Sequence, residues 1–219
     1  MNTIFTKIFD ATPFDKKEIL RYAGAKEDTP EISELIESCI EEAKSNLSYK
    51  VCYGHFPVSV KGNMVDLSFI ETESAGLAKN LVRCRSIVLF GATVGIELDR
   101  LISRYGKISP LRALIFQAIG AERIESLCDE FTRFIQKEYG ATVPRFSPGY
   151  GDFRLEVQKD FFRVLEPSKR IGLTLNESML MTPTKSVTAI IGITDEACEE
   201  QKHNCNNCNK TDCMYRRTL

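Results

Sequence analysis

The residues best suited to chemistry lie in one short stretch, RFSPGYGD, at 145–152. Arg145 offers a planar fork of hydrogen-bond donors that suits a carboxylate or a phosphate. Tyr150 offers a hydroxyl group and a ring face that attracts cations. Two glycines let the backbone bend and let a ligand come close, while Pro148 stiffens the approach. These residue types suit a small zwitterion; the alternative is a connection between two helices whose polar residues bind nothing.

A second group of chemically capable residues is the cysteine cluster at the end of the chain. Four of the eight cysteines lie there. The candidate metal ligands are Cys205, Cys208 and Cys213, with Cys198 or His203 as the fourth. Two thiolates three residues apart, closed by a third and a fourth ligand, suit a tetrahedral zinc ion. Iron–sulfur clusters use similar spacings, and a tail with free thiols is the third alternative. The other four, which we expect to be core residues, are Cys39, Cys52, Cys84 and Cys128.

The bulk composition is that of a soluble globular protein. Hydrophobic residues make up 43% of the 219 residues and charged residues 27%, which are ordinary values. The formal net charge of −1 and the lack of a basic run argue against binding to nucleic acid or to a membrane surface. The sequence also lacks a secretion signal and a membrane-spanning apolar segment. We therefore expect a cytoplasmic protein.

The elements that must position these residues follow from the periodicity of apolar side chains. A stripe with the helical period predicts a long helix over 110–138, which Gly140 ends. Further helices are expected at 14–24, 30–43, 74–81, 96–106 and 155–165, and strands at 49–60, 64–69, 86–95, 172–183 and 185–195. The last two strands are expected to pair with each other as a hairpin. Because helices and strands do not alternate strictly, we expect an α+β fold rather than a doubly wound nucleotide-binding fold.

A glycine-flanked turn at 91–95 offers a competing ligand site. A turn of this kind between a strand and a helix is how nucleotide folds place phosphates or S-adenosylmethionine. Gly91 and Gly95 do not complete the dinucleotide fingerprint, however. We therefore interpret them as glycines that permit tight packing of a strand against a helix.

The opening stretch and the later segment GLTLNESMLMTPTKSVTAIIG at 172–192 together resemble the activation domain of cobalamin-dependent methionine synthase. The family signature of arginine, proline, glycine and tyrosine falls on Arg145, Pro148, Gly149 and Tyr150. The family's later strand and proline turn fall on Leu175, Glu177, Ser178, Pro183, Ser186 and Val187. Asn176 stands where the family often has threonine. The resemblance covers about 110–193 and is closest to stand-alone versions of the domain that also end in a cysteine cluster.

The resemblance implies both a fold and a function. The fold is α+β, a curved single domain over 1–196 with a twisted antiparallel sheet and flanking helices, followed by a cysteine-rich tail at 197–219. The function is to bind S-adenosylmethionine and to support reductive methylation of an inactive cobalamin on a separate corrinoid protein. The implied partner is a methionine synthase that lacks its own activation domain, or another corrinoid protein. A flavodoxin- or ferredoxin-like protein is the expected electron donor.

The resemblance also assigns roles to the residues of the signature. Arg145 is expected to pair with the carboxylate of S-adenosylmethionine through charge-assisted hydrogen bonds. Tyr150 is expected to hold the sulfonium end. Backbone groups of Ser147, Pro148 and Gly149 are expected to bond the adenine or the ribose.

An acidic residue on the long helix of the family holds the ammonium group of the ligand. Its best match is Glu125, with Ser126 in the alternative register. A further family aspartate near the N-terminus has no clear counterpart, and Asp152 is a candidate to replace it.

The implied methyl transfer needs placement more than acid–base catalysis, because the corrinoid and the sulfonium carry the difficult chemistry. In agreement, the chain has two histidines, His55 and His203, and no arrangement typical of nucleophilic catalysis. We interpret the chain as a component that supplies the reactivation function to a methyltransferase. The alternative hypothesis is a metal- or iron–sulfur-bearing accessory protein that docks on a corrinoid methyltransferase and transfers no methyl group itself.

Overall fold

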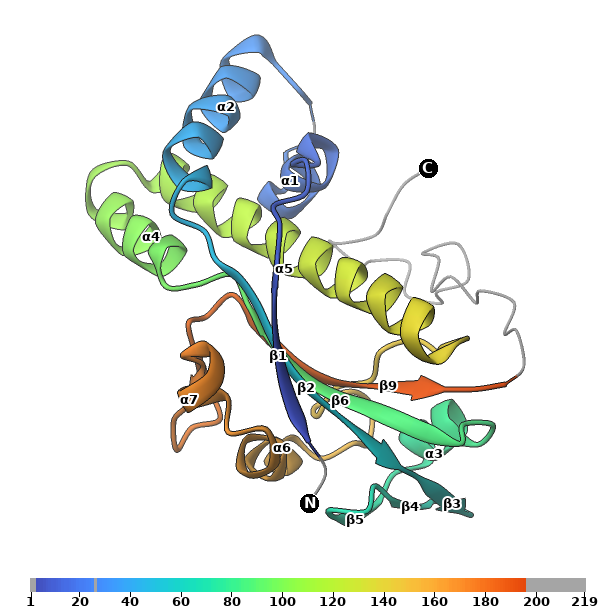
Figure 1. Ribbon diagram of the computed structural model, residues 1–219. Coiled ribbons are helices and arrows are strands. Elements are labelled where there is room, and N and C mark those ends of the chain that lie inside the picture. Colours follow the sequence, from blue (N-terminus) through green and yellow to red (C-terminus); the bar gives the residue numbers. More distant parts are fainter. Residues whose placement is uncertain (1–2, 26, 196–219) are drawn as a thin grey trace.

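A four-stranded antiparallel sheet forms the centre of the protein. The computed structural model describes residues 3–25 and 27–195. The strands follow the order β1 (Ile4–Phe9), β2 (Tyr49–Pro57), β6 (Ser86–Thr93) and β9 (Ser186–Ile193). The long helix α5 (Pro110–Tyr139) crosses one face of this sheet, as Figure 1 shows. This architecture confirms the predicted α+β fold with a twisted antiparallel sheet and flanking helices.

Shorter elements surround the central sheet. Two small antiparallel sheets are formed by β3 (Ser59–Lys61), β4 (Met64–Asp66) and β5 (Glu71–Glu73), and by β7 (Thr174–Leu175) and β8 (Met181–Thr182). The remaining helices are α1 (Lys16–Ala23), α2 (Pro30–Lys44), α3 (Ala75–Leu81), α4 (Glu97–Ile108), α6 (Gln158–Leu165) and α7 (Pro167–Ile171), with a 3₁₀ turn at Leu155–Val157. Among the helices of the described residues, none has the length and apolar character needed to span a bilayer.

The helix ends show why the local signals in the sequence were informative. Thr29 accepts a hydrogen bond from the backbone N–H of Ile32 at the start of α2, and Pro30 follows it in the first turn, where a proline costs no hydrogen bond. Gly140 ends α5 with a φ of 98°, a conformation that glycine adopts easily. These boundaries agree with the predicted ones.

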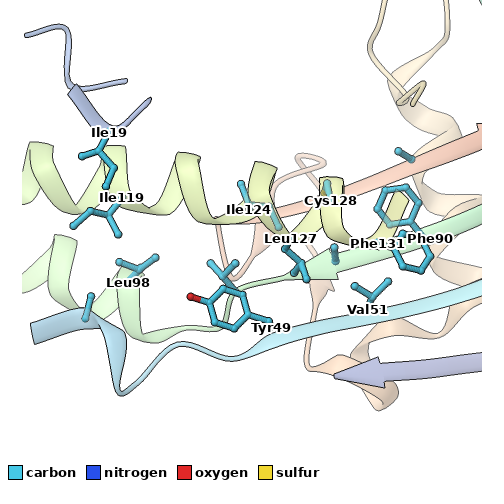
Figure 2. Close-up of a cluster of buried hydrophobic side chains, with 14 of the residues drawn as sticks. Ile19, Tyr49, Val51, Phe90, Leu98, Ile119, Ile124, Leu127, Cys128 and Phe131 are labelled. Atoms are coloured by element: carbon cyan, nitrogen blue, oxygen red, sulfur yellow. The ribbon is translucent and has the colours of Figure 1, made fainter. Parts of the chain in front are cut away.

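The hydrophobic core has two parts, one on each face of the central sheet. On the first face, α5 packs on the sheet and α1, α2 and α4 pack on α5; Figure 2 shows this cluster, with Phe90 of β6 against Phe131 of α5. On the second face, α3, α6, α7 and the β3–β5 sheet cover the strands. Every residue of β6 is buried, because helices cover both faces of the strand. This explains its continuous apolar sequence.

The expected late hairpin is wrong. β9 pairs with β6, from Ser86 opposite Ile193 to Thr93 opposite Ser186. The short hairpin β7–β8 lies entirely within the segment that was expected to be a single strand. β9 is apolar on both sides, and such a strand gains more by joining the central sheet between the two core clusters than by pairing with its exposed neighbour. The sequence also did not predict β1 and α7.

The competing nucleotide site at 91–95 is excluded. Gly91 lies inside β6, paired with Cys52 on one side and Thr188 on the other, and not in a turn before a helix. Both pairings are antiparallel, whereas nucleotide-binding turns of this type follow a strand of a parallel sheet.

Candidate ligand-binding site

The segment 142–146, which leads into the loop and includes its first two residues, lies along the outer edge of β9. Phe146 and Ile190 exchange two backbone hydrogen bonds of 2.9 Å, and Thr142 forms a bridge with Ile193. The side chain of Phe146 belongs to the core on the second face of the sheet. Because side chains alternate along an extended segment, Arg145 points toward the opposite side, where α5 lies.

The loop itself is closed by its own backbone. The N–H of Gly149 donates to the carbonyl of Phe153 at 2.7 Å, and the N–H of Tyr150 donates to the carbonyl of Ser147 at 3.1 Å. The φ of Gly149 is 91°, so this position requires glycine or strain. Phe153 and Pro148 are buried, whereas 57% of Tyr150 is exposed. The loop thus presents Tyr150 from a fixed frame, which lowers the entropy lost on binding.

Arg145 reaches three side chains on one face of α5. Its Nη1 donates to Asp129 Oδ1 at 2.7 Å and to Thr132 Oγ1 at 3.2 Å, and its Nη2 donates to Glu125 Oε2 at 3.1 Å. The Thr132 hydroxyl in turn donates to the carbonyl of Cys128. Within the described residues, Arg145 Nε donates no hydrogen bond, and 24% of the side chain is exposed. One edge of the guanidinium is therefore available to a carboxylate.

The charges around Arg145 leave a local excess of negative charge. Burial alone would lower the pKa of the guanidinium, but the neighbouring acidic groups of Cys128, Asp129 and Glu125 raise it above its usual value. Burial also raises the pKa of the nearby Cys128 thiol. The thiol is therefore neutral, and the cluster holds one cation and two carboxylates. Such a cluster accepts a carboxylate on the free arginine edge and a cation beside Glu125 or Asp129.

The structure brings Glu125 together with Arg145, as expected for two residues that share one ligand. Ser126, the alternative in the other register, bonds the hydroxyl of Thr12 at 2.6 Å and faces away from this cluster. Asp129 and Thr132 were missed by the sequence prediction. Their spacing from Glu125, four and seven residues along a helix, places all three on one face and is the signal that would have found them.

Asp152 is engaged in a different interaction from the one that the sequence suggested. Its carboxylate accepts hydrogen bonds from the hydroxyl of Ser74 and from the N–H groups of Ala75 and Gly76, at the start of α3. These bonds, led by the one from Ser74, lower the pKa of the Asp152 carboxyl. Asp152 therefore caps α3, which precedes it in the chain, and does not cap the helical turn that follows it.

Asp10, an aspartate near the N-terminus, lies in a segment that runs along α5. The segment after β1 is held on α5 at two points, where Phe9 packs on Phe131 and where Thr12 bonds Ser126. Asp10 is exposed and lies between these two points. Its backbone therefore passes the stretch of α5 that carries Glu125 and Asp129, which makes Asp10 an additional candidate for contact with a cation.

A cavity in the described part of the protein lies away from this cluster. It has a volume of about 550 Å³ and lies between β5, the start of α3 and the start of α6. Its described lining includes Asp152 and several other carboxylates, but neither Arg145, Glu125 nor Tyr150. The arginine cluster is instead an open site at the surface. We select the arginine cluster as the candidate ligand site because of the chemistry of its side chains and not because of its depth.

The predicted metal site lies outside the described residues. This holds for the expected ligands Cys198, Cys205, Cys208 and Cys213 and for the whole tail at 197–219. Within 3–25 and 27–195, no three histidine, cysteine or acidic residues are grouped so that they could hold a metal ion. Cys39, Cys52 and Cys128 are buried thiols, as expected for core residues, whereas Cys84 is half-buried and its thiol donates to the carbonyl of Asn80.

Comparisons with known proteins agree with these observations. Residues 69–217 match the family described as vitamin B12 dependent methionine synthase, activation domain. A crystal structure described as the MetH reactivation domain bound to AdoHcy is similar to this chain, with a TM-score of 0.64 and 14% sequence identity. The match covers 89% of this chain and 79% of that one; at this identity it shows the fold. A search of curated proteins finds no match.

Proposed function

Because the chain belongs to the vitamin B12-dependent methionine synthase activation-domain family, we propose that it binds S-adenosylmethionine and supports reductive methylation of cobalamin. The cobalamin is held by a separate corrinoid protein, and the proposed partner is a methionine synthase without an activation domain of its own. The observation that carries the proposal is the pairing of Arg145 with Glu125 beside the glycine-closed loop. It joins a carboxylate binder and an ammonium binder, as an α-amino acid head group requires.

The free edge of Arg145 supports the assignment of the ligand carboxylate. Asp129 and Thr132 occupy Nη1 and Glu125 takes one hydrogen of Nη2, which leaves Nε–H and the second hydrogen of Nη2. These two donors form the side-on fork that binds a carboxylate with two parallel bonds. The ligand can bind there without displacing the acidic residues that hold the arginine in place.

Glu125 is the proposed partner of the ligand ammonium. Its carboxylate accepts one hydrogen bond from Arg145, and 48% of its side chain is exposed, so it keeps lone pairs for a second cation. The excess negative charge of the cluster disfavours a simple carboxylate and favours a zwitterion.

Tyr150 and the loop backbone are the proposed contacts for the rest of the ligand. The exposed ring of Tyr150 can hold the sulfonium, since an aromatic face attracts a cation. The carbonyl of Ser147 and the N–H of Gly149 are used within the loop, so contacts to the adenine or ribose must come from the other backbone groups of Ser147, Pro148 and Gly149. The protein's contribution to methyl transfer is then to hold the methyl group in line for attack. The partner's reduced cobalamin supplies the nucleophile, and a flavodoxin- or ferredoxin-like protein is the proposed source of the electron.

Calorimetric titration with S-adenosylmethionine tests this proposal. Wild-type protein should bind the ligand, and Arg145→Ala should weaken binding by roughly one to two orders of magnitude, because a charged hydrogen-bonding partner is lost. Decarboxylated S-adenosylmethionine is the matched probe, since it lacks the group that Arg145 is proposed to hold. It should bind more weakly to the wild type and should not distinguish the two proteins. Equal affinity of both proteins for S-adenosylmethionine itself would rule out this site.

The alternative hypothesis, an accessory protein that carries a metal or an iron–sulfur cluster, is favoured by no observation within the described residues. A visible spectrum of anaerobically purified protein, recorded beside the titration, separates the two. Absorption typical of an iron–sulfur cluster without binding of S-adenosylmethionine would support the alternative. Binding of the ligand supports the reactivation function.

A further inference from the structure

The loop 145–152 is joined to α3, a distant part of the chain, by the carboxylate of its own residue Asp152. Asp152 Oδ1 accepts from the Ser74 hydroxyl at 2.6 Å and from the Gly76 N–H at 3.1 Å, while Oδ2 accepts from the Ala75 N–H at 2.6 Å. The first N–H groups of a helix have no partner within the helix. Asp152 therefore satisfies two of these N–H groups in α3. With the bond from Ser74, three hydrogen bonds converge on its side chain.

The start of α3, to which Asp152 is bonded, is itself held by further hydrogen bonds. Ser74 accepts a hydrogen bond from the N–H of Leu77 at 3.0 Å, and its own N–H donates to the carbonyl of Asn63 at 2.9 Å. Its hydroxyl thus caps α3 and donates to Asp152 at the same time. Leu77 is fully buried, so Asp152 is anchored to an element that is fixed in the core.

The start of α3 is also shaped to receive the loop. A Cβ atom at Gly76 would lie 3.0 Å from Asp152 Oδ1 and 3.2 Å from the Phe146 ring. Both distances are shorter than ordinary van der Waals contact. Phe146 begins the loop and Asp152 ends it, so one glycine admits both ends of the same segment.

These contacts divide the candidate site into two independently held halves. Arg145 is positioned by Asp129, Thr132 and Glu125 on α5, whereas the part of the loop that carries Tyr150 is positioned from α3 on the other face of the sheet. We propose that Asp152 is a positioning residue, which holds Tyr150 and the backbone of 147–149 for the adenosyl part of the ligand without touching the ligand. This inference rests on the proposed function.

A carboxylate is the group that this position requires. All three partners of Asp152 donate, and the two oxygens of an ionised carboxylate act only as acceptors. An asparagine of the same shape would turn an N–H₂ group toward at least one donor. Asp152→Asn should therefore weaken the hydrogen bonds between the loop and α3, even though the side chain keeps its size. Asp152→Ala should remove these bonds.

The test compares two ligands in each variant. Asp152→Ala should weaken S-adenosylmethionine binding about tenfold, and Asp152→Asn by a smaller factor, when measured by calorimetry. Binding of methionine, followed by NMR titration at millimolar concentration, should not change, because methionine needs only the Arg145 half of the site. A purely structural role for Asp152 would weaken both ligands alike. Gly76→Ala, which crowds the carboxylate of Asp152 from the α3 side, should reproduce the effect of Asp152→Asn.

Glu156→Ala is the matched control, because Glu156 is an exposed carboxylate near Asp152 that lies 3.6 Å from the exposed guanidinium of Arg154. It should bind S-adenosylmethionine as the wild type does, and circular dichroism should show every variant folded. Unchanged affinity in Asp152→Ala and Asp152→Asn, together with weakened affinity in Arg145→Ala, would overturn this inference alone. Unchanged affinity in Arg145→Ala would instead overturn the proposed function.

Discussion

Two arginines on opposite sides of α5 have the same chemistry and different surroundings. Arg123 is fully buried, and its donors go to the carbonyl of Thr12 at 2.6 Å, the carbonyl of Pro13 at 2.8 Å and the carboxylate of Glu122. Arg145 is partly exposed and bonds only side chains, with its Nε edge open. Arg123 therefore holds the β1–α1 connection on the helix, whereas Arg145 keeps donors for a ligand.

The difference teaches how to separate a structural arginine from a binding one. Arg123 and Glu122 form a neutral pair from which water is excluded, and the ring of Phe14 covers the guanidinium at 4.1 Å. Arg145 instead faces two carboxylates, so its cluster carries a net charge that a ligand can compensate. Unused donors and uncompensated charge at the surface indicate binding; backbone partners and neutrality in the core indicate structure.

The largest expected effect comes from breaking the buried pair. Arg123→Met leaves Glu122 buried without its partner, and such a loss typically costs about 3–5 kcal/mol of unfolding free energy. Urea denaturation followed by circular dichroism measures the change. The double variant Glu122→Gln, Arg123→Met should recover part of the loss, because it removes the orphaned charge. If Arg123→Met lowered the unfolding free energy by less than about 1 kcal/mol, Arg123 would not be the arginine that stabilises the fold.

The same substitution at the exposed position should cost much less. Arg145→Met should lower the unfolding free energy by no more than about 1 kcal/mol, because partly exposed ion pairs are screened by water. The same denaturation experiment provides the value. A loss as large as that in Arg123→Met would mean that Arg145 mainly holds the segment 142–146 on α5, and the contrast between the two arginines would disappear.

Much of the frame around these residues could be predicted from local sequence. The stripe of α5 and the continuous apolar run of β6 each specify an element, because burial on one face or on both leaves a distinct pattern. The pairing of β9 with β6 could not be predicted, because it depends on the two core clusters that only the assembled fold creates. The signature loop connects α5 to the following helical segment, as the sequence predicted, and its role in binding a ligand stays a prediction.

Local sequence patterns could not predict which side chains contact the loop 145–152. The resemblance leaves Glu125 and Ser126 as alternative registers, and only the rotation of α5 against the segment 142–146 shows that Glu125 faces Arg145. Asp152 lies 78 residues from Ser74, so no helical or strand period connects them. Arg123 is a charged residue in a helix, which by composition alone suggests exposure, yet it is fully buried.

The smallest expected effect concerns Asp129, and it sharpens the account of how Arg145 is held. Asp129→Asn keeps an acceptor for Nη1 but removes the charge, so the 2.7 Å bond becomes an ordinary one worth about 1 kcal/mol less. The arginine fork should then be less well oriented, and affinity for S-adenosylmethionine should fall by about two- to fivefold in calorimetric titrations.

Glu130→Gln is the matched control for that variant, because it removes the same charge from the neighbouring position, where Glu130 pairs with Arg133. It should leave the affinity unchanged, and raised salt should not erase the difference between the two variants, since a positioning contact is local whereas the field of the cluster is screened. A rise in affinity in Asp129→Asn would reverse the assignment. Asp129 would then compete with the ligand carboxylate for Arg145, and the open Nε edge would not be where the ligand binds.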